Sequence, residues 1–266
     1  MSDTFPRRIV CLTEETTETL YLLGEQNRIV GISGYTVRPA QARKENPKVS
    51  AFTWAKIGAI LDLNPDLVLG FSDMQADIAA ELIRHGINVM VFNQRSLDEI
   101  LDMIRCLSRM VGNQSGGENL IADLQTNIAR INEISAKLNY RPKVYFEEWN
   151  DPLISGIRWV SELIEIAGGC DCFEELSSFA GAKDRIIADQ NEVIRRNPDI
   201  IIGSWCGKKF QAQQIRSRQG WNEITAVKNN HLFEIKSPLI LQPGPAALTD
   251  GLQELSKIIS SVAVQG

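Results

Sequence analysis

Four tryptophans lie in loops near the ends of predicted β-strands, at Trp54, Trp149, Trp159 and Trp205. Large rigid rings with one polar atom suit a broad, flat or amphipathic ligand, although the same rings can also roof a packed interior. A single ring of this kind would more often belong to a core, but four of them in strand-end loops favour ligand binding. Trp221 has no such context and is interpreted as structural.

Residues that could perform catalysis are few. The chain has two histidines, of which His85 precedes a glycine at a helix end and His231 lies in a turn, so both are interpreted as structural. Glu147 and Glu148 are adjacent and would point to opposite sides of a strand, which makes them a poor acid and base pair. No phosphate-binding loop, dinucleotide motif, zinc motif or nucleophile elbow is present. We therefore predict no catalytic residue, no metal ligand and no required cofactor.

Cys206 is the one residue with some promise for enzyme chemistry. Its thiol stands beside Trp205, and the nearby Lys208 and Lys209 could lower its pKa. The alternative is a buried or merely ligand-lining thiol, and the sparse catalytic inventory favours binding over turnover.

The ligand-binding candidates are chosen by their positions relative to the predicted strands. Parallel α/β sheets bind ligands beyond the carboxyl ends of their strands. The ligand-binding candidates chosen on this basis are Glu14, Tyr35, Phe52, Trp54, Phe71, Glu148, Trp149, Arg158, Trp159, Trp205, Cys206 and Leu239. The Trp205 ring is expected to be partly solvated at the mouth of a cleft.

An internal repeat indicates how these residues are positioned. Asn64-Pro65-Asp66-Leu67-Val68-Leu69-Gly70 recurs as Asn197-Pro198-Asp199-Ile200-Ile201-Ile202-Gly203, each time after an amphipathic helix. The residue before proline is driven out of the right-handed helical region, a buried strand follows, and glycine is expected to open the next turn. A second pair of strands, at Arg8 and Lys143, is followed in each case by an acidic pair that we expect to form a turn. Two similar α/β halves are predicted.

Strands alternate with helices in both halves, which is typical of doubly wound, mainly parallel sheets. The predicted strands are 8–12, 29–32, 67–70, 88–92, 143–147, 200–203 and 232–235, with a short edge strand at 49–50. The predicted helices are 16–24, 56–63, 74–85, 97–111, 158–167, 190–196, 209–217 and 246–262.

One long amphipathic pattern lies between the halves, with apolar residues from Leu120 to Ile134 at spacings of three and four. It predicts a single stiff helix rather than a flexible linker. The predicted domains are therefore an N-terminal α/β lobe at 1–112, a linking helix at 113–139 and a C-terminal α/β lobe at 140–266, with a ligand cleft between the lobes.

Composition excludes several classes of protein. The chain has 266 residues, 44% hydrophobic and 23% charged, and a net charge of −5, which argues against a general nucleic-acid binder. No apolar run approaches the length of a membrane span. The N-terminal segment has no export signal, so the location is expected to be cytoplasmic as the chain is written and periplasmic if a leader was removed. We expect a monomer.

The repeat, the long helix and several local segments resemble the helix-linked (class III) substrate-binding proteins of ABC importers, most closely the vitamin B12 (cobalamin) group. The segments that carry the resemblance are Arg8 to Leu12, Arg28 to Ser33, the first Asn-Pro-Asp strand, Gly86 to Val89 and Trp159 to Gly169. The resemblance implies two Rossmann-like lobes and noncatalytic binding of a corrinoid between aromatic side chains, with Phe71 and Trp205 at ligand-stacking positions and Tyr35 at a further contact.

The resemblance also implies a partner, the permease of an ABC transporter, which family members meet through one acidic residue on each lobe. This sequence offers Asp77 near the first place, whereas Lys208 and Lys209 make the second place basic. The sequence departs from the docking pattern here, and a cytoplasmic binding protein stays open as an alternative.

Two other functions remain open. A ferric siderophore or haem binder could use Arg38, Arg95 and Arg158 for anionic groups. A chelatase-like or cofactor-handling enzyme on a related fold would use Cys206 or Glu148. Turnover would favour the enzyme, and reversible stoichiometric uptake would favour a binding protein.

Overall fold

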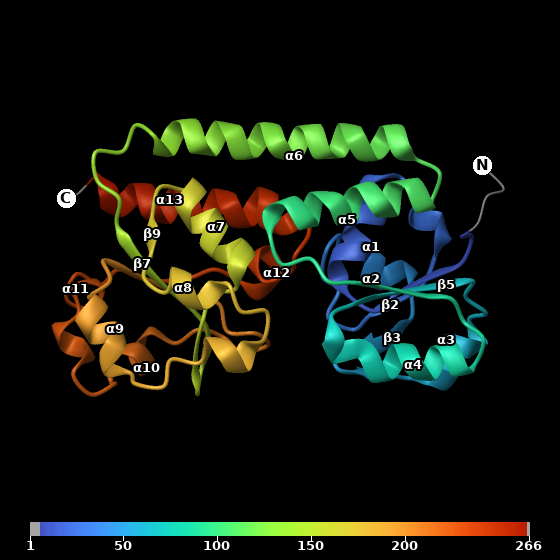
Figure 1. Cartoon of the computed structure of the whole chain (residues 1–266), viewed down its shortest axis with the longest axis horizontal. Helices are drawn as coiled ribbons and strands as arrows, with labels where there is room; N and C mark the ends of the chain where they lie inside the picture. Colours follow the sequence, from blue (N-terminus) through green and yellow to red (C-terminus); the bar gives the residue numbers. More distant parts are fainter. Residues whose placement is uncertain (1–5, 265–266) are drawn as a thin grey trace. The chain divides into compact units, whose positions relative to one another are not determined.

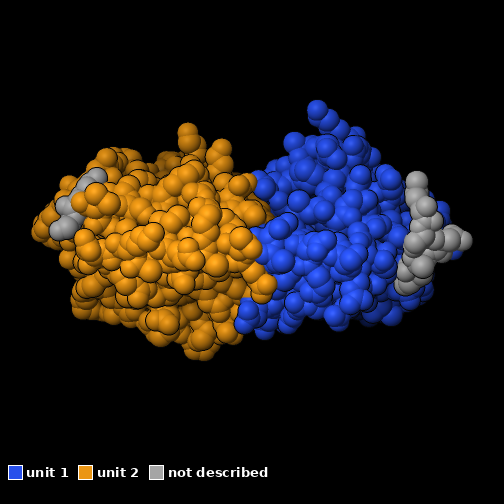
Figure 2. All heavy atoms as spheres, turned by 90° about the horizontal axis from the view of Figure 1, so that it is seen from above, with its two compact units in different colours: residues 1–94, 98–124 blue, residues 95–97, 125–266 orange. Residues whose placement is uncertain are grey.

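The computed structural model describes residues 6–264, which form two compact units (Figures 1 and 2). Unit 1 comprises residues 1–94 and 98–124, and unit 2 comprises residues 95–97 and 125–266. Residues 1–5 of the segment that we assessed for an export signal lie outside the described residues. Across the described range, no helix has both the length and the apolar character that a membrane span requires.

Unit 1 is built on a six-stranded sheet in the order β4-β3-β2-β1-β5-β6. All neighbouring pairs are parallel except β3 and β4, which form an antiparallel hairpin at the edge. Its strands are β1 (Ile9–Cys11), β2 (Ile29–Ser33), β3 (Lys48–Ala51), β4 (Trp54–Ala55), β5 (Leu67–Phe71) and β6 (Val89–Phe92). Its helices are α1 (Glu14–Leu22), η1 (Gln26–Arg28), α2 (Ala42–Glu45), α3 (Ile57–Asp62), η2 (Asp73–Gln75), α4 (Ala76–Arg84) and α5 (Leu97–Met110). The first residue of α5, Leu97, is assigned to unit 2.

Unit 2 has a five-stranded sheet in the order β11-β10-β7-β8, with β9 also paired to β7. Strand β8 is antiparallel to β7, and the other pairs are parallel. The strands are β7 (Lys143–Asn150), β8 (Leu153–Ser155), β9 (Cys170–Asp171), β10 (Ile200–Gly203) and β11 (Leu232–Glu234). The helices are α7 (Arg158–Ile166), α8 (Glu174–Ser177), η3 (Ala182–Arg185), α9 (Asn191–Arg196), α10 (Ala212–Arg216), η4 (Trp221–Glu223), α11 (Thr225–Lys228), α12 (Ser237–Ile240), η5 (Ala247–Gly251) and α13 (Leu252–Ala263).

The predicted long helix is present as α6 (Gln114–Ser135), and the boundary between the units falls within it. Its first half joins unit 1, where Glu118 pairs with Arg105 of α5 at 3.1 Å. Its second half joins unit 2, where Arg130 donates to Gln253 of α13 at 2.8 Å. Figure 1 shows α6 in green along α5 and α13.

The internal repeat has the same physical basis in both units. Asn64 and Asn197 end their helices with left-handed backbone, at φ 45° and 47°. The repeated aspartates then bind the start of the neighbouring strand: Asp66 Oδ1 accepts from the backbone N–H of Arg8 at 3.0 Å, and Asp199 Oδ2 accepts from that of Lys143 at 2.8 Å. Each Asn-Pro-Asp segment therefore stops a helix and sets the register of two parallel strands.

The repeated glycines end the predicted strands 67–70 and 200–203, and they were expected to open the turn that follows. Gly70 and Gly203 belong to β5 and β10. A Cβ at Gly203 would lie 2.1 Å from the Phe210 ring, and one at Gly70 would lie 2.9 Å from Gln75 Oε1. Neither glycine has a positive φ, so close packing at the carboxyl end of the strand, rather than turn geometry, favours glycine at both positions.

Several predicted boundaries are wrong. Glu14 and Glu15 begin α1 instead of forming a turn, because the helix starts directly after Thr13. The helix predicted at 209–217 is shortened to α10 because Phe210 packs into the core. The helix predicted at 246–262 opens with the π-helical turn η5. The short strands β8 and β9 were not predicted, since three and two residues carry no periodic signal.

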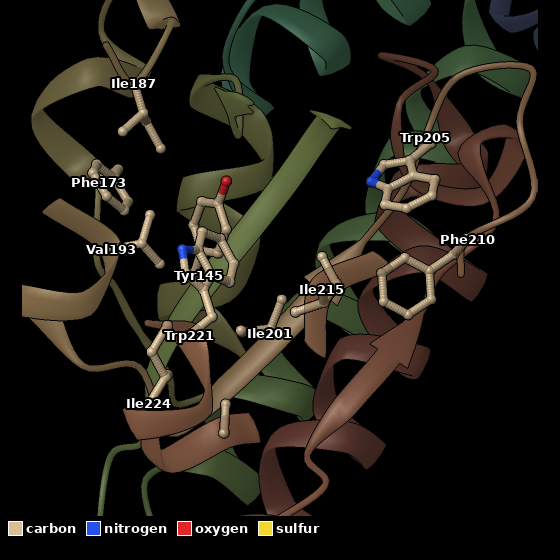
Figure 3. Packing of buried hydrophobic residues seen from close by; sticks show 11 residues of the cluster. Tyr145, Phe173, Ile187, Val193, Ile201, Trp205, Phe210, Ile215, Trp221 and Ile224 are labelled. Carbon is tan, nitrogen blue, oxygen red and sulfur yellow. The ribbon is translucent and has the colours of Figure 1, made fainter. Parts of the chain in front are cut away.

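The apolar cores lie on the sheets. In unit 1, Ile60 of α3 and Ile78 and Leu82 of α4 pack on Val10 and Val68 of the central strands. In unit 2 the largest buried rings cluster around β7 and β10 (Figure 3), where Tyr145 contacts Phe173 and Trp221 edge to face. With these cores in place, the strand ends hold the candidate side chains.

Candidate functional site

Hydrogen bonds tie together the carboxyl ends of four strands of unit 1. The backbone N–H of Gly34, after β2, donates to Ser50 O of β3 at 2.7 Å, and Ser50 Oγ donates to Leu12 O, after β1, at 3.3 Å. Gln75 joins β5 to the same region, because its Oε1 accepts from Phe71 N–H and its Nε2 donates to Phe52 O at 2.8 Å. The loops after these strands therefore form one continuous edge, which we call the unit 1 rim.

The unit 1 rim carries the five candidates predicted in this half of the chain. Tyr35 is 56% exposed and Trp54 is 57% exposed, whereas Phe71 is buried. The half-buried Phe52 lies against Phe71, with ring centroids 6.4 Å apart and planes tilted by 37°. Large aromatic side chains seldom remain open to solvent in such number within one edge of a sheet, so the rim has the composition of a binding surface.

Glu14 is the fifth candidate on this rim, and it is buried together with Glu15. Burial raises the pKa of the Glu14 carboxyl to about 8, and the neighbouring Glu15 and Glu18 carboxylates raise it further, while the Arg43 guanidinium opposes the shift. The pKa of Glu15 is raised to about 7, again chiefly by burial, although the Thr13 hydroxyl donates to its Oε1 at 2.6 Å. Glu18 pairs with Arg38 at 2.9 Å. A protonated carboxyl in this position can donate a hydrogen bond as well as accept one.

In unit 2, Glu147 and Glu148 both belong to β7 instead of forming the expected turn, and they bind different arginines. Glu147 is fully buried and pairs with Arg218, which donates from Nη2 to Oε1 at 2.9 Å. Glu148 keeps 21% of its side chain exposed and pairs with Arg185. The two carboxylates therefore have separate cationic partners and do not form an acid and base pair.

The solvent exposure of the Trp205 ring differs from the prediction. We expected it to be partly solvated, but it is only 3% exposed and packs edge to face on Phe210, with ring centroids 5.1 Å apart (Figure 3). Its indole N–H donates to Glu147 Oε1 at 2.9 Å. The buried Glu147 carboxylate is stabilised by hydrogen-bond donors, and the Trp205 indole supplies one of them only when the ring is buried beside it. The next residue, Cys206, is exposed.

Trp159 is also buried, and its indole N–H donates to Ile240 O at 2.8 Å, which links α7 to α12. Leu239 of α12 is half-buried. Arg158 is exposed and pairs with Glu162 one helical turn on, at 2.9 Å. Trp149 is half-buried, its indole N–H donates to Asp151 O, and the Lys208 ammonium lies 3.9 Å from the centre of its ring. Glu148 and Trp149 lie in the last part of β7, and the other side chains lie in the segments that follow β8, β10 and β11. We call this region the unit 2 rim.

Sequence reasoning missed the two arginines of this rim. Arg185 and Arg218 lie in segments without periodicity, and nothing in their local sequence marks a buried cation. Only the neighbouring pair Glu147-Glu148, in an otherwise buried strand, signalled that compensating charges were needed. Among residues 6–264, no group of three or more His, Cys, Asp and Glu side chains is arranged to hold a metal ion.

Two units with mainly parallel sheets, and with aromatic and charged side chains beyond their carboxyl ends, define an α/β protein of the ligand-binding class. Residues 9–239 match the family described as periplasmic binding protein, and the chain belongs to this family. The predicted fold class, and the resemblance to substrate-binding proteins of ABC importers, are confirmed.

Individual relatives are distant but cover most of the chain. A vitamin B12-binding protein of Vibrio parahaemolyticus is 27% identical over 91% of this chain and 85% of its own length. The uncharacterized ABC transporter substrate-binding lipoprotein YvrC of Bacillus subtilis is 24% identical over 96% of this chain and 80% of its own.

Solved structures share the fold. The vitamin B12-binding protein BtuF of Vibrio cholerae has a TM-score of 0.76 and 22% identity, covering 96% of this chain and 97% of that one. The periplasmic heme-binding protein RhuT of Roseiflexus has a TM-score of 0.83 and 21% identity, covering 97% and 99%. Because vitamin B12 binders and heme binders share one framework, the fold alone does not select the ligand.

Proposed function

We propose that this protein binds a corrinoid or a related metal chelate reversibly and without chemical turnover, through side chains at the carboxyl ends of its strands. The observation that carries the proposal is the pair of exposed aromatic rings on the unit 1 rim, Tyr35 and Trp54, beside the tilted Phe52 and Phe71 rings. Flat apolar faces of this kind bury the face of a macrocycle, and the names of the vitamin B12-binding relatives support this ligand class.

Haem is the second candidate, and one observation favours it. The phenol of Tyr35 is exposed on the rim, and a tyrosine oxygen can serve as an axial ligand of haem iron. No side chain of the rims is assigned a catalytic role in either case.

We further propose that the protein works outside the cytoplasmic membrane and delivers its ligand to an ABC importer, as the lipoprotein relative's name suggests. Asp77, exposed in the first turn of α4, is available for a permease arginine. Lys208 and Lys209 are also exposed, so unit 2 would have to use another acidic residue for the second contact.

A direct titration tests the binding proposal. The purified chain is mixed in turn with hydroxocobalamin, haemin and a ferric hydroxamate, and visible spectra and calorimetry record what is retained. Retention of hydroxocobalamin at one equivalent, recovered unchanged after denaturation, is the expected result. Retention of haemin alone would favour the second candidate, and a ligand recovered chemically altered would contradict noncatalytic binding.

A further inference from the structure

Glu148 occupies an irregular position in its strand. In the pairing of β7 with β8, Glu147 lies opposite Ser155 and Trp149 lies opposite Ile154, so β7 has one extra residue between these pairs. That extra residue is Glu148. A bulge of this kind re-aims a side chain and recurs beside binding sites. Here it leaves Glu148 partly exposed on the unit 2 rim, while Glu147 remains fully buried.

The buried Arg185 guanidinium contacts both oxygens of the Glu148 carboxylate. Its Nη1 lies 2.7 Å from Glu148 Oε2, and its Nη2 donates to Oε1 at 3.2 Å. The guanidinium is 2% exposed, so the solvent-facing part of the pair belongs to the carboxylate. A two-pronged contact from a planar fork fixes both the position and the plane of a carboxylate, which a lysine cannot do.

Arg185, which holds the Glu148 carboxylate, is itself bound to β8. Arg185 Nη1 also donates to Ser155 O, and Ser155 Oγ donates back to Arg185 O at 3.3 Å. Two residues on, the backbone N–H of Ile187 donates to Leu153 O at 2.9 Å. Both the backbone and the side chain of Arg185 are therefore fixed to the hairpin that carries Glu148.

A fixed carboxylate has a defined chemical preference. Its two oxygens offer about four acceptor positions, and the two Arg185 contacts use only part of them. Ligand N–H groups can therefore bind it, whereas a ligand carboxylate would face like charge at this position. Two cations of the unit 2 rim are already engaged, because Lys208 lies over the Trp149 ring and Arg158 pairs with Glu162.

We infer that Glu148 is a specificity-determining residue that selects a chelate bearing carboxamide groups over one bearing carboxylates, and that Arg185 is the positioning residue that makes this selection possible. The inference rests on the proposed function and narrows its ligand class. It favours an amide-substituted corrinoid over haem, whose propionates are anionic.

The test compares two ligands that differ only in these groups. Hydroxocobalamin carries propionamide side chains, and mild hydrolysis converts some of them to propionates on the same ring and metal. The measured quantity is the ratio of the two dissociation constants. The unsubstituted chain is expected to favour hydroxocobalamin by about tenfold or more, the range for a hydrogen bond to a charged group.

Glu148→Gln keeps the shape of the side chain and removes its charge, so it should reduce the ratio by about tenfold, towards one. Arg185→Met should also reduce the ratio, because the carboxylate is no longer held in place. In the Glu148→Gln background, Arg185→Met should change the ratio no further. Glu254→Gln, which removes a carboxylate from an exposed pair with Lys257, is the matched control and should leave the ratio unchanged.

The outcomes separate the two proposals. If the unsubstituted chain retains neither of these ligands, nor haemin or a ferric hydroxamate, the proposed function itself fails, whereas retention of haemin in place of both corrinoids overturns only the present inference. If it binds both ligands equally, or if Glu148→Gln lowers both affinities by one factor with an unchanged ratio, only the present inference is overturned and Glu148 is structural. Should Arg185→Met fold poorly in a denaturant melt, Glu148→Gln alone decides the matter.

Discussion

The indole nitrogen of Trp205 lies 2.9 Å from Oε1 of the fully buried Glu147, to which it donates a hydrogen bond. The same carboxylate accepts from the Tyr145 hydroxyl at 3.0 Å and from both terminal nitrogens of Arg218. A buried charge is tolerated only when its acceptor positions are filled in this way. The tryptophan that sequence reasoning assigned to ligand stacking is therefore also a part of the unit 2 core.

Substitutions of Trp205 should act on stability. Trp205→Ala is expected to cost about 3–5 kcal/mol of unfolding free energy, as for other large aromatic truncations in a core. Trp205→Phe keeps a ring but removes the donor, and should cost about 1.5–3 kcal/mol, the value for a hydrogen bond to a charged group. Urea melts followed by circular dichroism measure both. A nearly unchanged melt with a large loss of ligand affinity would instead restore the solvated ring of the original prediction.

Glu147 and Arg218 should show strong coupling. Arg218→Met leaves a buried carboxylate without its cation, so a loss of about 3–5 kcal/mol is expected. Adding Glu147→Gln should recover much of that loss, because the uncompensated charge is then gone. Lys228→Met breaks an exposed pair with Glu223 in the same unit and should change stability by less than about 0.5 kcal/mol. Additive losses in the double variant would contradict a coupled pair.

The buried glutamates of unit 1 should make stability fall as pH rises. Glu14 has a folded pKa of about 8 against an ordinary value of 4.5, so the folded state retains a proton that the unfolded chain releases. Its stabilising contribution is complete below about pH 4.5 and is lost progressively up to about pH 8, at about 1.4 kcal/mol per unit of pKa difference. Glu15 acts in the same direction up to about pH 7.

Glu14→Gln tests this assignment, because an amide cannot release the proton. The variant should be more stable than the unsubstituted chain at pH 9 and similar to it at pH 4.5, as measured by urea melts at both values. Glu254→Gln, on the surface of α13, is the control and should follow the unsubstituted chain. Parallel pH profiles for all three proteins would show that Glu14 is ionised in the folded state.

Features fixed by local chemistry could be predicted from the sequence. The Asn-Pro-Asp repeat identified a helix end and a buried strand in each half, because the proline restraint and the apolar run act within a few residues. The side on which a tryptophan packs could not be predicted. Trp54 and Trp205 look alike in sequence, yet one is 57% exposed and the other 3%. The difference comes from Glu147, whose position 58 residues away appears only in the fold.

Trp54 should behave in the opposite way to Trp205. Its ring stands on β4 at the edge of the unit 1 sheet, where Trp54 pairs with Ala51 across the hairpin. Because the ring is largely exposed, Trp54→Ala should change the free energy of unfolding by less than about 0.5 kcal/mol. The affinity for hydroxocobalamin should fall by about 1–3 kcal/mol, roughly 5- to 150-fold, since an aromatic surface that the ligand covers is lost. Calorimetric titration and a urea melt of the same preparation give both numbers.

Leu22→Ala removes another exposed apolar side chain, from α1 outside the candidate set, and should leave the affinity unchanged. An affinity of Trp54→Ala equal to that of Leu22→Ala would remove Trp54 from the site and leave Tyr35, Phe52 and Phe71 as the aromatic candidates of the unit 1 rim.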